Sequence, residues 1–324
     1  MSFDPDVVRL FAQLQEAAQP PMETLPIEGA RAMLRAVGAQ FGFPRIEMAE
    51  VRDLNADADA ATGAVPLRLY RPTGLATGPA PTCLYVHGGG GLVGDLESHD
   101  DVCRQLAARA GCQVLAIHYR LAPEHPAPAG VEDVIAILHW LVAHPDTVGA
   151  DVQRLAVCGD SIGGAMAAVA ALAARDAGIA LRCQLLVYPL TDARQDSGLY
   201  PSRSLNAGLP PLTAAAVEFF NRHLLPDMAV ADDWRVSPML APDVAGVAPA
   251  LVVVCDRDML YDEGRAYAER LRAAGVEVTL HSFPGMIHGF INMGSVLRAA
   301  GETLDLAALT LRQRLLPAIE RRAA

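Results

Sequence analysis

The sequence RLAVCGDSIGGAMAAVAALAA, residues 154–174, decides the predicted fold. Its first residues, 154–158, are apolar apart from Arg154, as in a strand buried on both faces of a sheet. Gly159-Asp160-Ser161-Ile162-Gly163 follows at once and fits the pattern G-x-S-x-G. Residues 162–174 then form an apolar run that is too short to span a bilayer and indicates a buried helix. We therefore predict a strand, a sharp turn and a helix, with a serine at the turn.

Short apolar runs occur on both sides of this turn and alternate with helical stretches. The predicted strands are residues 65–70, 82–86, 113–117, 154–158, 183–187, 251–255 and 276–283. The predicted helices between them are residues 101–110, 131–142, 162–174 and 262–274. This alternation is typical of an α/β fold with a mostly parallel central sheet flanked by helices.

Two regions depart from the alternation. The first forty or so residues have the apolar spacing of two helices. Residues 191–233 are rich in proline and irregular, with one predicted helix at 212–223. A long insertion beside the strand ends of an α/β sheet is usually a lid or a binding element.

The serine at the turn is the first candidate catalytic residue. A strand-to-helix turn as sharp as this one leaves the serine strained and its hydroxyl exposed at the sheet edge. The hydroxyl of Ser161 would also lie at the N-terminal end of a helix, whose dipole favours developing negative charge. We predict that Ser161 is a nucleophile; the alternative is a glycine-rich helix start without chemistry.

Four consecutive glycines, Gly88 to Gly91, follow His87 and the strand 82–86. Such a run costs chain entropy unless the backbone must approach another group closely. We interpret it as an oxyanion hole, built from glycine N–H groups and the N–H of Ile162, the residue after the serine. A phosphate-binding loop is the alternative, but the G-x-G-x-x-G spacing is absent. His87 itself is expected to hold the loop through hydrogen bonds.

The general base and the acid should follow the serine along the chain, in the order acid then histidine. Of nine histidines, His288 lies just past the predicted strand 276–283, among glycines and a proline. The alternative for such a residue is an ordinary solvated loop histidine. Asp256, Asp258 and Asp262 all follow the strand 251–255, and position alone favours Asp258 only modestly over Asp256.

Composition excludes several other chemistries. The chain has 324 residues and no lysine, so all 26 basic residues are arginine, against 37 acidic residues and a net charge of −11. A Schiff-base lysine, a P-loop lysine and a Ser-x-x-Lys acyl enzyme are therefore impossible. The acidic balance argues against nucleic acid and anionic membranes as main partners. Six scattered cysteines without a C-x-x-C pair, and an N-terminus without a secretory signal, predict buried free thiols in the cytoplasm.

Taken together, these motifs resemble the bacterial hormone-sensitive-lipase-like esterases (family IV) of the α/β-hydrolase fold, over nearly the whole chain. The matching segments are His87-Gly-Gly-Gly, His118-Tyr-Arg-Leu-Ala-Pro-Glu-His-Pro-Ala-Pro-Ala, Gly159-Asp-Ser-x-Gly-Gly and the block from Ser237 to His288-Gly-Phe. In that last block the family's usual Asp-Pro-Leu aligns with Asp258-Met-Leu. The resemblance therefore implies Asp258 as the acid, and Gly89 and Gly90 as oxyanion donors.

The resemblance also implies an architecture and an activity. Residues 1–45 and 191–233 would form a helical cap over a catalytic domain of residues 46–190 and 234–324. Members mostly hydrolyse short- to medium-chain carboxylic esters through a Ser-His-Asp triad, with no cofactor or metal. Many are dimers, and the predicted edge strand 276–283 offers a pairing surface for a homodimer. An amidase, carbamate hydrolase or lactonase on the same triad, an interfacial lipase and a non-catalytic ligand receptor are the alternatives.

Three residues depart from the family pattern. Gly91 stands where an aromatic residue is usual, Ile162 where alanine is usual, and Met259 where proline is usual. From these we expect a more flexible glycine loop or a wider pocket at Gly91, a narrower pocket at Ile162, and a slightly looser loop at Met259. None of the three removes a catalytic group, so all three bear on substrate preference.

Overall fold

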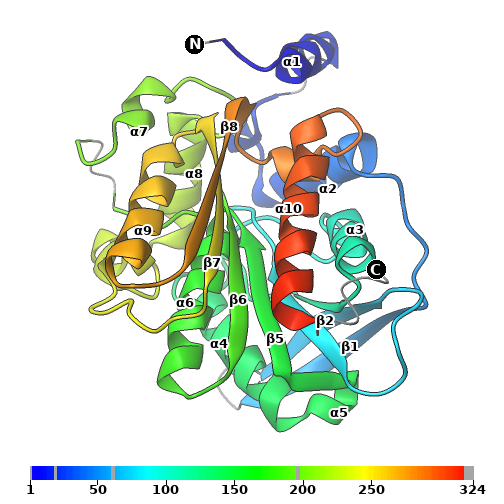
Figure 1. Ribbon diagram of the computed structural model, residues 1–324. Helices are drawn as coiled ribbons and strands as arrows, with labels where there is room; N and C mark the ends of the chain where they lie inside the picture. The colour runs from blue at the N-terminus through cyan, green and yellow to red at the C-terminus, as the bar shows by residue number, and fades with distance from the viewer. Residues whose placement is uncertain (1, 18–19, 60–62, 195–197, 317–324) are drawn as a thin grey trace.

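Eight strands form one sheet in the computed structural model, which describes residues 2–17, 20–59, 63–194 and 198–316 (Figure 1). The strands are β1 (Glu50–Asp59), β2 (Gly63–Arg71), β3 (Ala80–Val86), β4 (Gln113–Ile117), β5 (Ala150–Asp160), β6 (Leu181–Val187), β7 (Ala250–Arg257) and β8 (Val278–Ile287). Their order is β1-β2-β4-β3-β5-β6-β7-β8. The pairs β1–β2 and β2–β4 are antiparallel and all others are parallel. The predicted α/β fold with a mostly parallel sheet is confirmed.

Helices cover both faces of the sheet. They are α1 (Pro5–Ala17), α2 (Ile27–Phe41), α3 (Asp100–Ala110), α4 (Ala129–Ala143), α5 (Pro145–Val148), α6 (Ile162–Asp176), α7 (Pro201–Leu205), α8 (Ala214–Leu224), α9 (Tyr261–Ala273) and α10 (Arg298–Leu315). Four short 3₁₀ turns complete the described part: Met22–Thr24, Met228–Asp232, Pro238–Leu240 and Phe290–Asn292. No helix of the described residues is long and apolar enough to cross a membrane.

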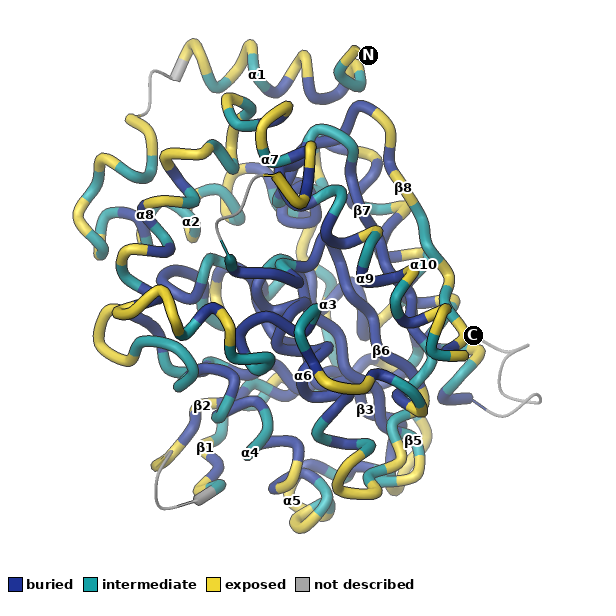
Figure 2. Tube along the Cα trace, turned by 90° about the vertical axis from the view of Figure 1, so that its left-hand side faces the viewer, coloured by how far each residue is buried: buried dark blue, intermediate teal, exposed yellow. Residues whose placement is uncertain are grey.

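The core consists of two apolar layers separated by the sheet. Side chains of β3 alternate between them: Cys83 and Tyr85 pack with α3 and α10, and Leu84 and Val86 pack with α4 and α6. The whole of β3 is buried, as the dark central strands in Figure 2 show. Burial on both faces explains why the central strands have continuous apolar sequences rather than alternating ones.

The last strand differs from its prediction. We expected a strand at 276–283 followed by a loop around His288, but β8 continues to Ile287. The continuation includes Pro284, which can occur here because β8 is an edge strand whose other side has no ladder to maintain. The register against β7 shifts between Cys255 and Arg257, so a bulge accommodates the proline and Gly285. His288 therefore follows directly from the strand.

Candidate active site

Ser161 occupies the sharp turn between β5 and α6. Its backbone has φ 57° and ψ −123°, in the left-handed region that a non-glycine residue rarely adopts. The turn is tight enough to require the flanking glycines. A Cβ on Gly159 would lie 2.2 Å from the carbonyl oxygen of Gly163, and a Cβ on Gly163 would lie 2.1 Å from that of Val86. The N–H of Ser161 donates to the carbonyl of Val187 on the neighbouring strand at 2.8 Å, which fixes the turn to the sheet.

Ser161, His288 and Asp258 come together at the carboxyl ends of three strands. The Oγ of Ser161 lies 2.9 Å from Nε2 of His288, and Nδ1 of His288 lies 2.7 Å from Oδ2 of Asp258. The second carboxylate oxygen of Asp258 accepts a hydrogen bond from the N–H of Leu260 at 2.9 Å. Asp258 is 2% exposed and His288 8% exposed, so water has little access to the pair. The Tyr188 ring lies 4.7 Å from the His288 ring and limits its movement.

The two other aspartates near the end of β7 have different partners. Oδ1 of Asp256 accepts the N–H of Gly285 at 2.6 Å, within the bulge of β8. Oδ2 of Asp262 accepts the N–H of Ser202 at 2.7 Å. Of the three aspartates that position left open, only Asp258 contacts the histidine.

The glycine loop after β3 faces the same serine. Gly89, Gly90 and Gly91 have φ values of 117°, 62° and 72°. A Cβ on Gly89 would lie 2.1 Å from the carbonyl oxygen of Val93, and a Cβ on Gly90 would lie 2.3 Å from the ring of Phe220. Gly89, Gly90 and Ile162 all line the cavity into which Ser161 opens. The predicted oxyanion donors and Ser161 therefore line the same cavity.

Sequence comparison identifies the family. A family model described as the α/β-hydrolase fold matches residues 83–292. The chain is 38% identical over 326 residues to the ethyl acetate hydrolase of Pseudomonas putida, covering 97% of this chain and all of that protein. It is 42% identical over 277 residues to the carboxylic ester hydrolase LipN of Mycobacterium tuberculosis, covering 82% and 71%. The chain belongs to the hormone-sensitive-lipase-like carboxylesterases. It is a carboxylic ester hydrolase, as predicted.

Solved structures of related esterases have the same fold as this carboxylesterase over most of its length. An ester hydrolase from the metagenome of Lake Arreo, bound to a bipyridine phosphonate derivative, has a TM-score of 0.89 at 38% identity and covers 96% of this chain and 98% of its own. The thermostable carboxylesterase EstE1, cloned from a metagenomic library, has a TM-score of 0.84 at 34% identity and covers 91% and 99%.

Asp160 connects the two halves of the esterase site, and sequence reasoning missed it. Its Oδ1 accepts the N–H of Gly88 at 3.0 Å and the hydroxyl of Tyr85 at 2.9 Å, and Nε2 of His99 lies 3.5 Å away. Burial acts to raise the pKa of Asp160, but His99 and the Tyr85 hydroxyl together keep that pKa below its usual value. A buried carboxylate therefore joins the serine turn to the glycine loop. The sequence could not indicate this, because Gly88 and Asp160 are far apart along the chain.

The family-matching segment from His118 to Ala129 supports the glycine loop of the esterase. The Tyr119 hydroxyl donates to the carbonyl of His87 at 3.0 Å, and the Tyr119 ring stacks on the His87 ring at 4.3 Å. Further along, the N–H of Ala122 donates to the carbonyl of Gly91 at 2.8 Å. His87 is buried and its Nδ1–H donates to the Gly88 carbonyl at 2.8 Å. Burial lowers the pKa of His87 to about 3, so it is neutral, in keeping with its expected structural role.

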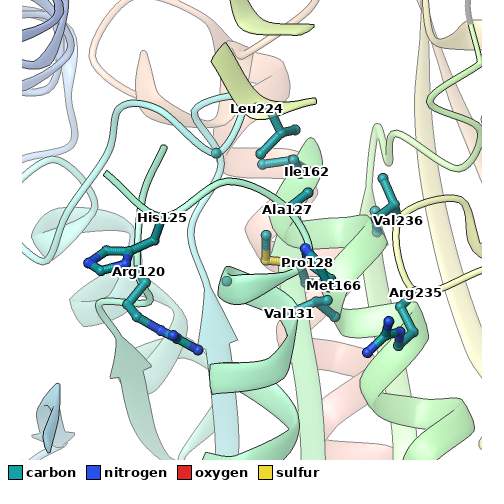
Figure 3. Close-up of a pocket in the computed structure, with 13 residues that line it drawn as sticks. Arg120, His125, Ala127, Pro128, Val131, Ile162, Met166, Leu224, Arg235 and Val236 are labelled. Atoms are coloured by element: carbon teal, nitrogen blue, oxygen red, sulfur yellow. The ribbon is translucent and has the colours of Figure 1, made fainter. Parts of the chain in front are cut away.

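The catalytic cavity of the esterase has a volume of about 470 Å³ and a largely apolar wall. Helices from three parts of the chain line it: Leu10 and Leu14 come from α1, Met33, Leu34 and Val37 from α2, and Val217, Phe220 and Leu224 from α8. A second, much smaller cavity of about 20 Å³ lies beyond Ile162 and Leu224 (Figure 3). At Gly91 a Cβ would lie 2.7 Å from Cδ1 of Leu224, so the Leu224 side chain occupies the space beside this glycine. The more flexible loop or wider pocket expected there stays a prediction.

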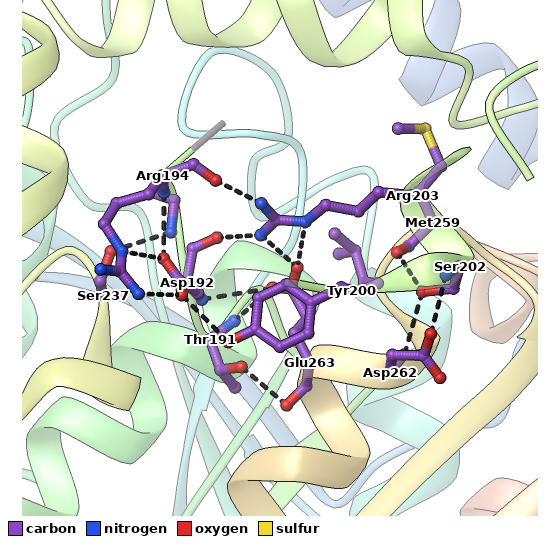
Figure 4. Close-up of polar contacts among 12 residues, drawn as sticks. Thr191, Asp192, Arg194, Tyr200, Ser202, Arg203, Ser237, Met259, Asp262 and Glu263 are labelled. Atoms are coloured by element: carbon purple, nitrogen blue, oxygen red, sulfur yellow. Dashed lines mark hydrogen bonds and ion pairs between the residues drawn. The ribbon is translucent and has the colours of Figure 1, made fainter. Parts of the chain in front are cut away.

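The part of the 191–233 insertion that contains α7 is attached to the loop of residues 258–260, which we call the acid loop because it contains Asp258. The carboxylate of Glu263 on α9 is fully buried where α9 meets α7 (Figure 4). One oxygen accepts the N–H groups of Thr191 and Asp192 at 2.8 and 3.2 Å, and the other accepts Nε and Nη2 of Arg203 at 3.0 and 2.6 Å. Burial raises the pKa of Glu263 to about 7, although Arg203 acts to lower it.

Neighbours of Arg203 reach the acid loop itself. The Ser202 hydroxyl donates to the carbonyl of Met259 at 2.8 Å, and the Asn206 amide donates to the carbonyl of Asp258 at 2.8 Å. Ser202 and Asn206 thus hold the backbone of Asp258 and Met259 in place. The loosening expected from Met259 stays a prediction.

Within the described residues, no group of three or more His, Cys, Asp or Glu side chains is arranged to hold a metal ion.

Proposed function

We propose that Ser161, His288 and Asp258 are the catalytic triad of this carboxylesterase. The observation that carries the proposal is the continuous hydrogen-bonded chain from Asp258 through His288 to Ser161, which opens on the apolar cavity. His288 takes the proton from the Ser161 hydroxyl as its oxygen attacks the ester carbonyl carbon. Asp258 keeps His288 in the correct tautomer and stabilises the imidazolium. His288 then protonates the leaving alcohol, and water hydrolyses the acyl enzyme by the same route.

The negative charge that develops on the carbonyl oxygen needs donors. We propose the N–H groups of Gly89, Gly90 and Ile162 for this role. The first turn of a helix has N–H groups without partners inside the helix, which makes the N–H of Ile162 a natural donor. A single such donor contributes roughly 3 kcal/mol of transition-state stabilisation in comparable enzymes.

The substrates we propose are small esters with short to medium acyl chains. The cavity of about 470 Å³ is large enough for such molecules and is lined mostly by apolar side chains. One relative, 38% identical, is named for the hydrolysis of ethyl acetate.

Rates with p-nitrophenyl esters from acetate to palmitate test this function. We expect the largest kcat/KM at butyrate to octanoate and loss of turnover by several orders of magnitude in Ser161→Ala. A maximum at palmitate would contradict the substrate proposal, and wild-type turnover in Ser161→Ala would contradict the triad. Matched amides and lactones, run in the same assay, separate esterase from amidase and lactonase activity.

We also propose an organisation for the chain. Residues 1–45 and 191–233 would form a helical cap over the catalytic domain of 46–190 and 234–324, although residues 1, 18–19, 60–62, 195–197 and 317–324 lie outside the described part. The supporting observation is that α1, α2 and α8 line the cavity above the serine. The edge position of β8 supports a homodimer, which a dimer mass in light scattering would test. Six buried free thiols support a cytoplasmic location.

A further inference from the structure

Two cavities meet at one wall beside the serine turn. The larger contains Ser161 and His288. The smaller, of about 20 Å³, is lined mostly by apolar side chains, which include Val131, Met166 and Val236, and also by Arg120, His125 and Arg235. Ile162 and Leu224 line both cavities. Figure 3 shows these two side chains next to each other at one end of the smaller cavity.

The wall is narrow and closely packed. A Cβ on Gly91 would lie 2.7 Å from Cδ1 of Leu224 and 3.5 Å from Cδ1 of Ile162, so the two side chains converge over this glycine. Ile162 and Leu224 are each 5% exposed. The carbonyl of Leu224 accepts the N–H of Ala127 at 2.9 Å, which anchors the end of α8 beside the wall. Ile162 and Leu224 therefore lie between the cavity that contains Ser161 and the smaller, mostly apolar cavity.

The chemistry of the triad assigns one side of the substrate to this wall. His288 must protonate the leaving alcohol, so the alcohol part of the ester lies next to Nε2 of His288. His288 lines the larger cavity, but it does not line the smaller one in the part of the chain that the structure describes. The acyl chain, as the other substituent of the reacting carbon, is then the part that can extend past Ile162.

We propose that Ile162 and Leu224 set the upper limit of acyl-chain length, and that the small cavity behind them is an extension of the acyl pocket that these two side chains separate from it. The proposal rests on the triad function proposed above. Replacing either side chain by alanine removes three carbon atoms of the wall. The larger and smaller cavities would then join, and the apolar surfaces of Val131 and Met166 would contact the end of a longer chain.

The experiment compares Ile162→Ala, Leu224→Ala and a matched control, Leu138→Ala. Leu138 is a buried leucine of α4 that lines neither cavity among the described residues. The readout is the ratio of kcat/KM for p-nitrophenyl decanoate to that for butyrate. Because each added methylene that gains a contact changes discrimination by roughly tenfold or more, we expect this ratio to rise at least about tenfold in both wall variants. It should stay within a few-fold of wild type in Leu138→Ala.

A second series, of butyrate esters with alcohols from ethanol to octanol, separates the two sides of the substrate. The ratio for octyl to ethyl butyrate should not change in the wall variants. Three results would overturn the proposal: an unchanged acyl ratio in both wall variants, a shift in the alcohol series instead, or an equal shift of the acyl ratio in Leu138→Ala. Leu224→Ala tests the wall by itself if Ile162→Ala does not fold. Failure of the triad would be seen separately, as turnover by Ser161→Ala.

Discussion

At the scale of single residues, Asp256 and Asp258 show how neighbours of one type acquire different tasks. Both are at the carboxyl end of β7, so the sequence alone favoured Asp258 only modestly. The bulge in β8 decides between them, because it directs the N–H of Gly285 onto Asp256 and leaves Asp258 to contact His288. That bulge depends on a strand register, which is a property of two paired strands and not of either sequence.

Exchanging each aspartate for asparagine tests this division of tasks. Asp258→Asn should lower kcat by about 10⁴, because an amide donor opposite Nδ1 favours the wrong histidine tautomer. Asp256→Asn keeps an oxygen that accepts the N–H of Gly285, so its kcat/KM for p-nitrophenyl butyrate should remain within a few-fold of wild type. The reverse pattern would transfer the acid role to Asp256.

At the scale of elements, the sequence predicted those whose periodicity comes from burial on the sheet. The strands β2 to β7 and the helices α3, α4, α6 and α9 were found in this way. β1 was missed although Leu54, Ala56 and Ala58 alternate with polar residues. Its apolar side chains are mostly small and its polar ones include several aspartates, which are depleted in strands, so the segment does not have the composition of a strand. α10 was overlooked although Leu304, Ala308, Leu311 and Leu315 recur at helical spacing. α7 is held by the buried ion pair of Arg203 with Glu263, and because these two residues are 60 positions apart, the sequence has no local pattern that indicates the pair.

The stability of the contact between α7 and α9 should depend on pH once the Arg203 guanidinium is removed. Arg203→Met leaves Glu263 buried without its counter-charge, so we expect the free energy of unfolding to fall by about 3–5 kcal/mol at pH 8. Arg203 lowers the pKa of Glu263, and its loss raises that pKa further above the usual 4.5. When a carboxyl group has a higher pKa in the folded protein than in the unfolded chain, its protonation stabilises the fold. This stabilisation is complete below the pKa of the unfolded chain and is lost as the pH rises through the pKa of the folded protein. The variant should therefore lose less stability at pH 6 than at pH 8.

Urea unfolding at the two pH values measures this effect. Arg265→Met, on the exposed side of the same helix, is the matched control and should change the free energy of unfolding by less than about 0.5 kcal/mol. A loss in Arg203→Met that is equal at both pH values, or larger at pH 6, would show that Glu263 does not govern the attachment.

At the scale of the whole molecule, all six cysteines lie in one of the two apolar layers. They are Cys83, Cys103, Cys112, Cys158, Cys183 and Cys255, and α3 and α10 cover them. Burial raises the pKa of the Cys183 thiol to about 12, and it raises those of Cys103 and Cys255 as well. A buried thiol with a raised pKa reacts slowly, because the thiolate is the nucleophile. The sequence predicted buried free thiols, but not that one face of the sheet contains all of them.

This arrangement makes the thiols reporters of how the layers unfold. The strands contribute alternate side chains to both layers, so removing α10 alone would expose the whole apolar face of β5 and β6. We expect this opening to cost as much free energy as global unfolding, and we therefore expect the layers to unfold together. Leu311→Ala on α10 and Leu141→Ala on α4 remove the same buried atoms from opposite layers, at about 2–5 kcal/mol each. Labelling by a thiol reagent under native conditions should accelerate in both variants, and the logarithm of its rate should rise in proportion to each variant's loss of free energy of unfolding. Acceleration confined to Leu311→Ala would show that α10 opens by itself and that the two layers are separate cooperative units.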